Sequence, residues 1–447
     1  MTINHNSTPS APSLPSPPMA KKEVHIIIIG AGLTGLVFAQ ALRRFNDSPE
    51  AAAHPLRFRC TVFEREPSIF FRGGGYSLSF HWGLPHLEAA LPKDIFEGLQ
   101  DCLCNPHAVE TGQRGRFQYF NLRTGVPKLS GTPTPANPGT MRIARVAREK
   151  LIKLLMTGVD VQFDKALSHL SSPGMGEVCA HFADGTAATG NLVIGADGGK
   201  SAVRRAICGE QGEATVVPVR MMALRCPYPL EKVAKVRQVD PNVIMGGDPE
   251  NNTYYWFSFL DMPRPDSSVK VADCFMTFSW PFEDGSIVPR DNEKRIALAQ
   301  QLADQWAEPM REMVLDLPPE TWIHEINILE WVPKKGLWDN RHGTVTLVGD
   351  AAHPMSSFRG EAANHGVVDA INLLNALTGL GDKESNFTDP PSSVPDLRKP
   401  VEAYEDEMIH RTASAVEWST EACIDANHYD RVKEGSVFTR ARQMRVE

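Results

Sequence analysis

The sequence predicts an α/β chain in which a parallel sheet is interleaved with an antiparallel-sheet domain and followed by a long C-terminal helix. Short β-branched runs that end in glycine, at 24–29 and 192–194, are typical of strands buried on both faces of a parallel sheet. Alternating runs between 214 and 280 favour antiparallel strands. Apolar residues from 401 to 426 recur at helical spacing, which predicts the long helix.

The first elements form a βαβ unit. The strand at 24–29 is followed by a helix at 33–45, a surface connection at 46–57 and a second strand at 58–63. The buried pattern returns farther along the chain, together with further helices. We predict a helix at 148–155, strands at 178–182, 192–194 and 345–348, and a helix at 363–377.

A chain of 447 residues is too long for one compact core, so two intertwined domains are expected. The net charge of -8 argues against nucleic acid as a partner, because nucleic acid favours a basic surface. We expect a disordered tail at 1–22, a parallel-sheet domain at 23–100, 140–210 and 335–378, an antiparallel-sheet domain at 100–139 and 211–334, a loop at 379–400 and the C-terminal helix at 401–432.

Cysteine usage and the apolar pattern predict where the protein works. Its eight cysteines include no C-x-x-C pair, so we expect reduced thiols, no metal site and a soluble, cytoplasmic protein. Residues 1–20 are rich in Ser and Pro and lack an apolar segment, which argues against a signal peptide. No apolar run is long enough to span a membrane. The sequence makes no prediction of an oligomeric state.

Residues 30–35 read G-x-G-x-x-G between a buried strand and a helix, the context in which this motif binds a dinucleotide. Gly30 allows the tight turn, Gly32 lets a pyrophosphate approach the backbone, and Gly35 brings helix and strand together. The helix N-terminus favours the anion. Glu64 ends the second strand, where its carboxylate can accept hydrogen bonds from ribose hydroxyls.

Two further glycine–aspartate motifs favour FAD over NAD as the bound dinucleotide. Gly195-Ala196-Asp197-Gly198 follows the strand at 192–194, and Gly349-Asp350 follows the strand at 345–348. The extended ribityl chain and second phosphate of FAD need support far from the first turn. In this order the three motifs resemble the group A flavoprotein monooxygenases, the family of para-hydroxybenzoate hydroxylase and the tetracycline-inactivating monooxygenases.

The resemblance implies roles for individual residues. It implies that Glu64 holds the adenosine ribose and that Asp350 binds the ribityl and pyrophosphate region of FAD. The resemblance also implies that Asp197 contributes to the binding of FAD and of the pyridine nucleotide, mostly by holding the local structure in place. The R-x-x-L helix at 148–151 resembles the one whose arginine, here Arg148, contacts FAD, and Arg142 and Arg145 compete for that assignment.

Two more segments resemble cofactor contacts of the family. Residues 72–78, with Gly75, resemble the glycine-rich strand that passes the flavin. The start of the helix at 363–377 resembles the one whose N-terminus points at the flavin, so Ala363 and Asn364 are candidate cofactor residues. Here the sequence departs from many relatives, because Ser356-Ser357 replaces a proline pair and Glu361-Ala362 replaces Gln-Gly.

The resemblance implies a monooxygenase that uses NAD(P)H, bound transiently, and dioxygen to hydroxylate or epoxidise a small organic substrate through a C4a-hydroperoxyflavin. An aromatic, polyketide or terpenoid-type substrate is expected, as in fungal members of secondary metabolism. We name no catalytic acid or base. His353 is interpreted as structural, and His365 has no evident partner. The expected substrate region of the middle sheet contains Arg220, Arg225, Tyr254, Tyr255, Trp256, Phe257 and Phe259.

Three other functions stay open at this point. An FAD-dependent oxidase or dehydrogenase of the same fold withdraws hydride without inserting oxygen, since fold does not fix reaction. A redox-neutral flavoprotein cyclase uses the same pocket for rearrangement. A non-enzymatic carrier is disfavoured, because a carrier has little need of Asp350 and Asn364, and a halogenase is disfavoured because no W-x-W-x-I-P element is present.

Overall fold

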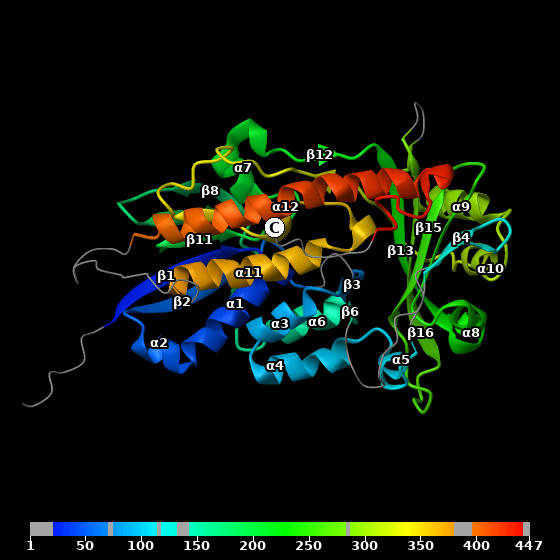
Figure 1. Ribbon diagram of the computed structural model, residues 1–447, viewed down its shortest axis with the longest axis horizontal. Coiled ribbons are helices and arrows are strands. Elements are labelled where there is room, and N and C mark those ends of the chain that lie inside the picture. The colour runs from blue at the N-terminus through cyan, green and yellow to red at the C-terminus, as the bar shows by residue number, and fades with distance from the viewer. Residues whose placement is uncertain are drawn as a thin grey trace, which may run out of the picture.

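A parallel sheet of five strands, in the order β19-β11-β1-β2-β7, forms the centre of the larger part of the molecule (Figure 1). Helices α1 and α11 pack on one side of it and a small antiparallel sheet on the other, so the isoleucines of β1 are buried. The predicted parallel sheet is therefore confirmed. Its strands are β1 (Lys22–Ile29), β2 (Leu56–Phe63), β7 (Val161–Gln162), β11 (Leu192–Gly195) and β19 (Val345–Leu347).

The computed structural model describes residues 21–69, 75–113, 118–131, 143–282, 287–379 and 396–440. Residues 1–20 of the tail predicted at 1–22 and residues 380–395 of the predicted loop lie outside these ranges, and Lys22 already belongs to β1. The helices around the parallel sheet are α1 (Leu33–Asn46), α2 (Pro49–Ala53), α3 (Leu84–Ala90), α4 (Lys93–Glu97), α6 (Arg148–Leu155), α7 (Ala202–Cys208), α11 (Ala362–Thr378) and α12 (Arg398–Ala426), and the small sheet contains β8 (Leu167–Ser171), β9 (Val178–Phe182) and β10 (Ala187–Gly190). Helix α5 (Pro106–Glu110) lies toward the other end of the molecule (Figure 1).

A seven-stranded sheet at the other end of the molecule, in the order β17-β13-β16-β15-β14-β4-β5, confirms the second sheet domain (Figure 1). Neighbouring strands are antiparallel except β14 and β4, which are parallel. The strands are β4 (Gln118–Asn121), β5 (Pro127–Ser130), β13 (Val219–Pro229), β14 (Val243–Gly247), β15 (Tyr254–Asp261), β16 (Val271–Pro281) and β17 (Ile323–Glu325), and the helices on the outer face are α8 (Leu230–Val239), α9 (Asn292–Ala303) and α10 (Met310–Leu315).

Alternate side chains of β15 pack in two different hydrophobic clusters, one on each face of the seven-stranded sheet. Tyr255 and Phe257 point to the outer face, where they pack with residues of α8, α9 and α10. Tyr254 points inward and packs in a cluster that includes Ala422 of α12. Because side chains alternate across a strand, only every second side chain of this aromatic run faces the part of the molecule that contains the parallel sheet. Two short strand pairs complete the fold: β3 (Ser77–Phe80) with β6 (Ala144–Ala147), and β12 (Thr215–Val216) with β18 (Leu329–Glu330).

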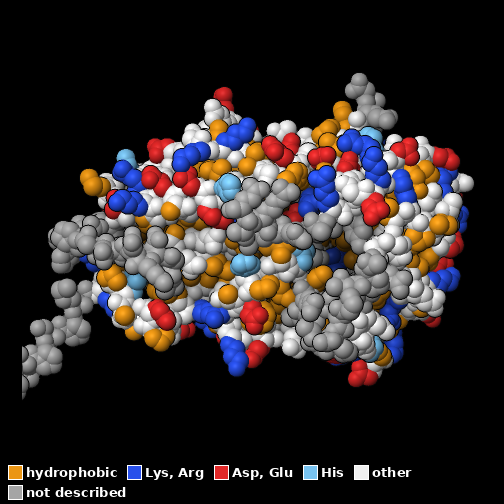
Figure 2. Space-filling view, in the orientation of Figure 1, with side chains coloured by type: hydrophobic (Ala, Val, Ile, Leu, Met, Phe, Trp, Pro, Cys, Tyr) orange, Lys and Arg blue, Asp and Glu red, His pale blue; other side chains and the backbone are white. Residues whose placement is uncertain are grey.

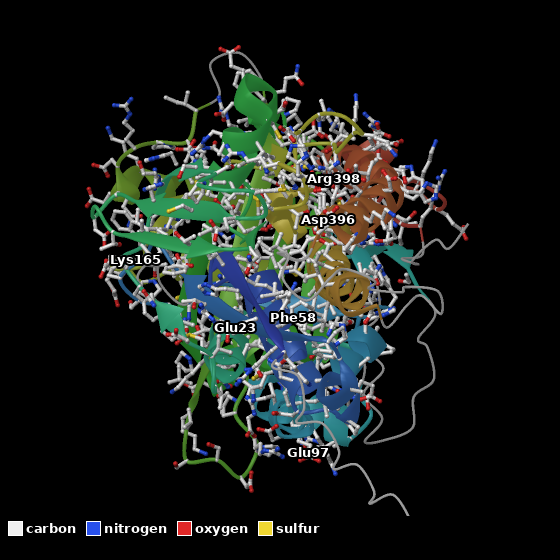
Figure 3. All side chains as sticks on the ribbon, turned by 90° about the vertical axis from the view of Figure 1, so that its left-hand side faces the viewer. Glu23, Phe58, Glu97, Lys165, Asp396 and Arg398 are labelled. Atoms are coloured by element: carbon white, nitrogen blue, oxygen red, sulfur yellow. The ribbon has the colours of Figure 1, made fainter. Side chains whose placement is uncertain are left out.

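Helix α12 runs from the parallel sheet to the seven-stranded sheet (Figure 1). It begins at Arg398 rather than 401, and the Asp396 carboxylate before it accepts a hydrogen bond from the Arg398 backbone N–H at 2.9 Å (Figure 3). It ends at Ala426 rather than 432, where the Asn427 side chain bonds the carbonyl of Cys423 at 2.8 Å. The predicted helix is confirmed with these corrected bounds.

The surface fits the modest net charge. On the face shown in Figure 2, basic and acidic side chains are interspersed.

Seen from the end of the parallel sheet, Glu23 lies on β1 and Phe58 on the neighbouring β2 (Figure 3). Among the described residues, no helix is long and apolar enough to cross a membrane.

Candidate functional site

Two glycines of the first turn are required by the fold itself. Gly30 has φ +112°, and a Cβ there would lie 2.4 Å from the carbonyl oxygen of Ala196. A Cβ on Gly35 would lie 2.4 Å from the carbonyl oxygen of Gly30. The turn between β1 and α1 therefore packs directly against the second glycine–aspartate motif, at the carboxyl end of the parallel strands.

Gly32 differs from these two glycines because the protein leaves space beside it. The nearest atom to a Cβ on Gly32 would be the Ala196 carbonyl oxygen, at 3.8 Å. Gly32 is also the N-cap of α1, and no side chain caps the helix there. Unpaired N–H groups at a helix N-terminus bind anions, so this turn offers an open cradle for a phosphate.

Glu64 is held beside this cradle. Its Oε2 accepts a hydrogen bond from the Ala31 N–H at 2.8 Å, and its Oε1 accepts one from the Glu66 N–H at 3.1 Å. Each carboxylate oxygen keeps a second lone pair. The carboxylate is thus oriented at the end of β2, with acceptor capacity left for a ligand hydroxyl.

The second motif is held together by its own side chains. Asp197 accepts hydrogen bonds from the Ser201 hydroxyl at 2.5 Å and the Ala202 N–H at 2.6 Å, so it caps the start of α7. Burial raises the pKa of Asp197, although these hydrogen bonds act in the opposite direction. Asp197 therefore contributes to the fold of the loop that contacts the first turn.

Arg204 connects the second and third motifs, a role that the sequence did not reveal. Its buried guanidinium donates to the carbonyl of Gly199 at 2.5 Å, of Gly212 at 2.7 Å and of Ala351 at 2.8 Å. Burial lowers the pKa of Arg204. The side chain thus fixes the loop after β11 to the loop after β19.

A buried ionic cluster fixes the third motif. Asp369 of α11 accepts hydrogen bonds from the Gly349 N–H at 2.7 Å, His353 Nε2 at 2.6 Å and Arg411 Nη2 of α12 at 2.7 Å. Burial acts to raise the pKa of Asp369, but His353 and Arg411 hold it well below its usual range. His353 therefore lies in a structural cluster, as the sequence indicated.

His365 has a partner after all. Arg411 of α12 donates to its Nδ1 at 3.0 Å, and the Trp82 ring contacts its ring edge-on at a centroid separation of 4.9 Å. The expectation of no evident partner was wrong, because the partner lies 46 residues away on α12. Burial, followed by the Arg411 charge, lowers the pKa of His365 well below its ordinary value.

The neutral, buried His365 predicts a loss of stability in mild acid. Its unfolded pKa is near 6.5, so below that pH the unfolded chain binds a proton that the folded chain excludes. The free energy of unfolding is therefore full well above pH 6.5 and falls as the pH drops through and below it, by at most about 1.4 kcal/mol for each pH unit from this residue. Urea unfolding above pH 6.5 and at pH 5.5 measures this loss of stability. His365→Gln should reduce the loss, whereas His410→Gln, at an exposed position of α12, should not. The same loss in both variants would contradict a role for His365.

The side chains of Tyr76, Arg148 and Asp350 come together where β3, α6 and the third motif meet, and we infer an open recess there. Tyr76 is 47% exposed and Asp350 is exposed, yet the surrounding protein raises the pKa of both side chains through desolvation. A side chain that lines a recess can be exposed to solvent and still be surrounded by enough protein to shift its pKa. The Arg148 guanidinium lies 5.8 Å from the Tyr76 ring centroid, and Gly75, with φ +72°, precedes it. Residues 72–74 and Arg142 lie outside the described residues.

The N-terminus of α11 is also uncapped by any side chain. Ala363 is half-buried in its first turn. Asn364 is fully buried, and all its side-chain hydrogen-bonding groups are used within the protein. Its Oδ1 accepts from the N–H groups of His81 and Gly83 at 3.1 and 3.0 Å, and its Nδ2 donates to the carbonyls of Ser79 and Gly360 at 3.0 and 3.1 Å.

The sequence departures before α11 have structural partners. The Glu361 carboxylate pairs with the Arg359 guanidinium at 2.6 Å, and both side chains are buried. The Ser356 N–H donates to the Ser419 hydroxyl of α12 at 3.1 Å. The extra negative charge at this helix start is thus neutralised within the protein.

The inner face of the seven-stranded sheet faces this part of the molecule. Trp256 of β15 lies on that face, and its ring centroid is 5.3 Å from the Arg145 guanidinium of β6. Of the expected substrate region, Tyr255, Phe257 and Phe259 point to the outer core instead. Arg225 forms ion pairs with Asp273 and Glu149, and Arg220 stacks on Phe282 at 4.3 Å.

The fold and this arrangement define an FAD-binding flavoprotein, and comparisons with known proteins agree. The family described as FAD binding domain matches residues 139–382, and the NAD(P)-binding Rossmann-like domain matches residues 28–88. The FAD-dependent monooxygenase tazP of Aspergillus terreus is 41% identical over 381 residues, which cover 83% of this chain and 94% of tazP. A probable FAD-dependent monooxygenase of Arthroderma benhamiae is 38% identical, over 91% of this chain and 93% of the relative.

Solved structures show the same fold. The 2,6-dihydroxypyridine-3-hydroxylase of Arthrobacter nicotinovorans has a TM-score of 0.70 at 18% identity, over 96% of this chain and 99% of that chain. HpxO of Klebsiella pneumoniae, complexed with FAD and uric acid, has a TM-score of 0.67 at 19% identity, over 91% and 90%. The chain belongs to the family of FAD-dependent monooxygenases, and is an oxidoreductase that binds FAD. The match to an NAD(P)-binding domain fits NAD(P)H as its co-substrate.

Proposed function

We propose that FAD extends from the first turn to the start of α11. Its pyrophosphate lies at Gly32 and the α1 N-terminus, between Gly30 and Gly35, and its adenosine ribose bonds Glu64. The open space at Gly32 and the oriented Glu64 carboxylate support this placement. The residues that line the recess hold the rest of the cofactor: Gly75, Arg148, Asp350 and the backbone of Ala363.

Asn364 takes a positioning role in this proposal. Its amide connects the β3 region to the α11 N-terminus through four hydrogen bonds, so it has no side-chain donor left for a ligand. It fixes the direction of α11, whose unpaired backbone N–H groups favour negative charge at that end. We infer that Asn364 orients the helix and that the helix contacts the cofactor.

We further propose that the substrate is a small aromatic molecule, bound between the recess and the inner sheet face. Bound FAD supplies hydride transfer from transiently bound NAD(P)H and activation of dioxygen for hydroxylation. The chain positions the substrate ring against Trp256 and Tyr254 and keeps water out. Buried hydroxyls of Ser258 and Ser279 on the same face have no hydrogen-bond partner among the described residues.

The two sheets support a division of labour between an FAD-binding domain and a substrate domain. We propose that division with the bounds expected from the sequence. All eight cysteines are free, which supports our proposal of an intracellular, reducing environment.

The test is NADPH oxidation by the purified yellow holoenzyme, with and without a panel of phenols, aromatic polyketides and terpenoid alkenes. We expect a phenol or aromatic polyketide to accelerate NADPH oxidation at least about tenfold and to gain one hydroxyl group. A terpenoid epoxide as the only product would overturn the aromatic substrate class. Hydrogen peroxide as the sole oxygen product with every compound would favour the oxidase alternative.

A further inference from the structure

Arg145 is a partly buried cation between the two sheets, outside the cofactor site that we propose. It lies on β6, three residues before Arg148, and its guanidinium lies 5.3 Å from the Trp256 ring centroid. Trp256 belongs to the inner face of the seven-stranded sheet. Arg148 contacts Tyr76 at the recess instead, so the two arginines have different surroundings.

The described partners of the Arg145 guanidinium are neutral. Nη1 donates to the Ser79 hydroxyl at 2.9 Å and Nη2 to the Ser77 hydroxyl at 2.5 Å. Its Nε is buried and has no hydrogen-bond partner. These serines orient the planar group, but a hydroxyl does not neutralise its charge.

No carboxylate of the described residues forms an ion pair with Arg145. The thiol of Cys104 is close, but burial raises its pKa to about 12, so it stays uncharged. Asp240 and Tyr254 act on Arg145 only through longer-range attraction. A buried guanidinium without a counter-ion is costly, and an anionic ligand removes that cost.

Arg145 is enclosed yet reachable. Its side chain retains partial solvent exposure, while surrounding protein lowers its pKa through desolvation. At the adjoining recess, Tyr76 and Asp350 are also exposed to solvent while the surrounding protein shifts their pKa values through desolvation. We infer that part of the guanidinium borders space that a ligand can enter, whereas Nε is enclosed.

We propose that Arg145 binds an anionic oxygen of the substrate, a phenolate, enolate or carboxylate, while the conjugated ring lies against Trp256. A planar guanidinium suits an anionic oxygen because its N–H groups are fixed in a fork. The inference rests on the proposed function, and it narrows the aromatic substrate class to acids. Arg145 is a specificity residue, since oxygen transfer itself is supplied elsewhere.

The test compares two flat probes of equal size, 2-naphthoate and 2-naphthamide, titrated into the FAD-loaded enzyme while flavin absorbance is recorded. The wild-type protein should bind the anion at least about tenfold tighter, which corresponds to 1.4 kcal/mol. Arg145→Met should bring the ratio near one, and Arg145→Lys should keep part of it. Arg311→Met, a partly exposed arginine of α10 on the outer face of the seven-stranded sheet, should leave the ratio unchanged.

Wild-type enzyme without preference for the anion would overturn the proposal, whether or not Arg145→Met folds. So would an Arg145→Met protein that retains FAD and the full ratio. Because binding needs no turnover, failure of every compound in the hydroxylation panel would count against the proposed function alone.

Discussion

Gly32→Ala should leave the apoprotein as stable as the wild type and weaken FAD binding at least about tenfold. The structure leaves room for a Cβ at this position, with the nearest atom 3.8 Å away, and its φ of -77° suits alanine. Any loss must therefore come from the ligand, because the added methyl group occupies the space where a pyrophosphate approaches the backbone. Titration of apoprotein with FAD, together with urea unfolding without FAD, checks both parts.

Gly35→Ala is the matched control, and its expected effect is the opposite. The added Cβ would lie 2.4 Å from the carbonyl oxygen of Gly30, so backbone must shift. We expect a loss of about 3 kcal/mol in the free energy of unfolding, the upper end of overpacking effects, even without FAD. A Gly32→Ala protein that binds FAD normally would place the pyrophosphate elsewhere.

Asp369→Asn should lower the free energy of unfolding by about 3 kcal/mol, because it removes a carboxylate that pairs a buried arginine. Among the described residues Arg411 then keeps Glu407 alone as an acidic partner, and the Gly349 N–H and His353 lose their charged acceptor. Since this cluster fixes the loop that carries Asp350, FAD release on dilution should also accelerate.

Asp406→Asn on α12 controls for this change. Asp406 also pairs with a cation, Lys335, but the two side chains are 53% and 78% exposed. Exposed pairs contribute about 0–1 kcal/mol, so this variant should resemble the wild type in chemical denaturation. Equal effects of the two substitutions would show that the buried cluster does not support the fold.

The glycine motifs could be predicted because their chemistry is local. Gly30, Gly32 and Gly35 are fixed by spacing between a buried strand and a helix, and the parallel sheet followed from β-branched runs. The long-range contacts could not be predicted in this way. Arg411 reaches Asp369 and His365 from a different helix, and no spacing rule connects residues 42 or 46 apart.

The aromatic run of β15 was harder to interpret for a different reason. Helices cover the outer face of its sheet, and the FAD-binding part covers the inner face. Large apolar side chains of β15 therefore occur on both faces. Alternation in hydrophobicity therefore carries no signal about direction. Tyr255 and Phe257 were placed in the substrate region by sequence position, whereas register places them in the outer core.

Arg145 illustrates the same limit of local reading. The sequence placed it beside Arg148 as a competing cofactor contact, because both flank the start of one helix. Pairing of β6 with β3 directs its guanidinium to Ser77, Ser79 and Trp256. Only the three-dimensional arrangement separates an arginine at the recess from one that faces the second sheet.

We propose that the FAD-loaded enzyme incorporates one atom of dioxygen into an aromatic substrate positioned between the two sheets. The most direct measurement is turnover under ¹⁸O₂ of the substrate that the panel identifies, with the product analysed by mass spectrometry. We predict one labelled oxygen in each product molecule, with one NADPH consumed and the second oxygen atom released as water. Product without label, formed with an equal amount of hydrogen peroxide, would contradict the claim.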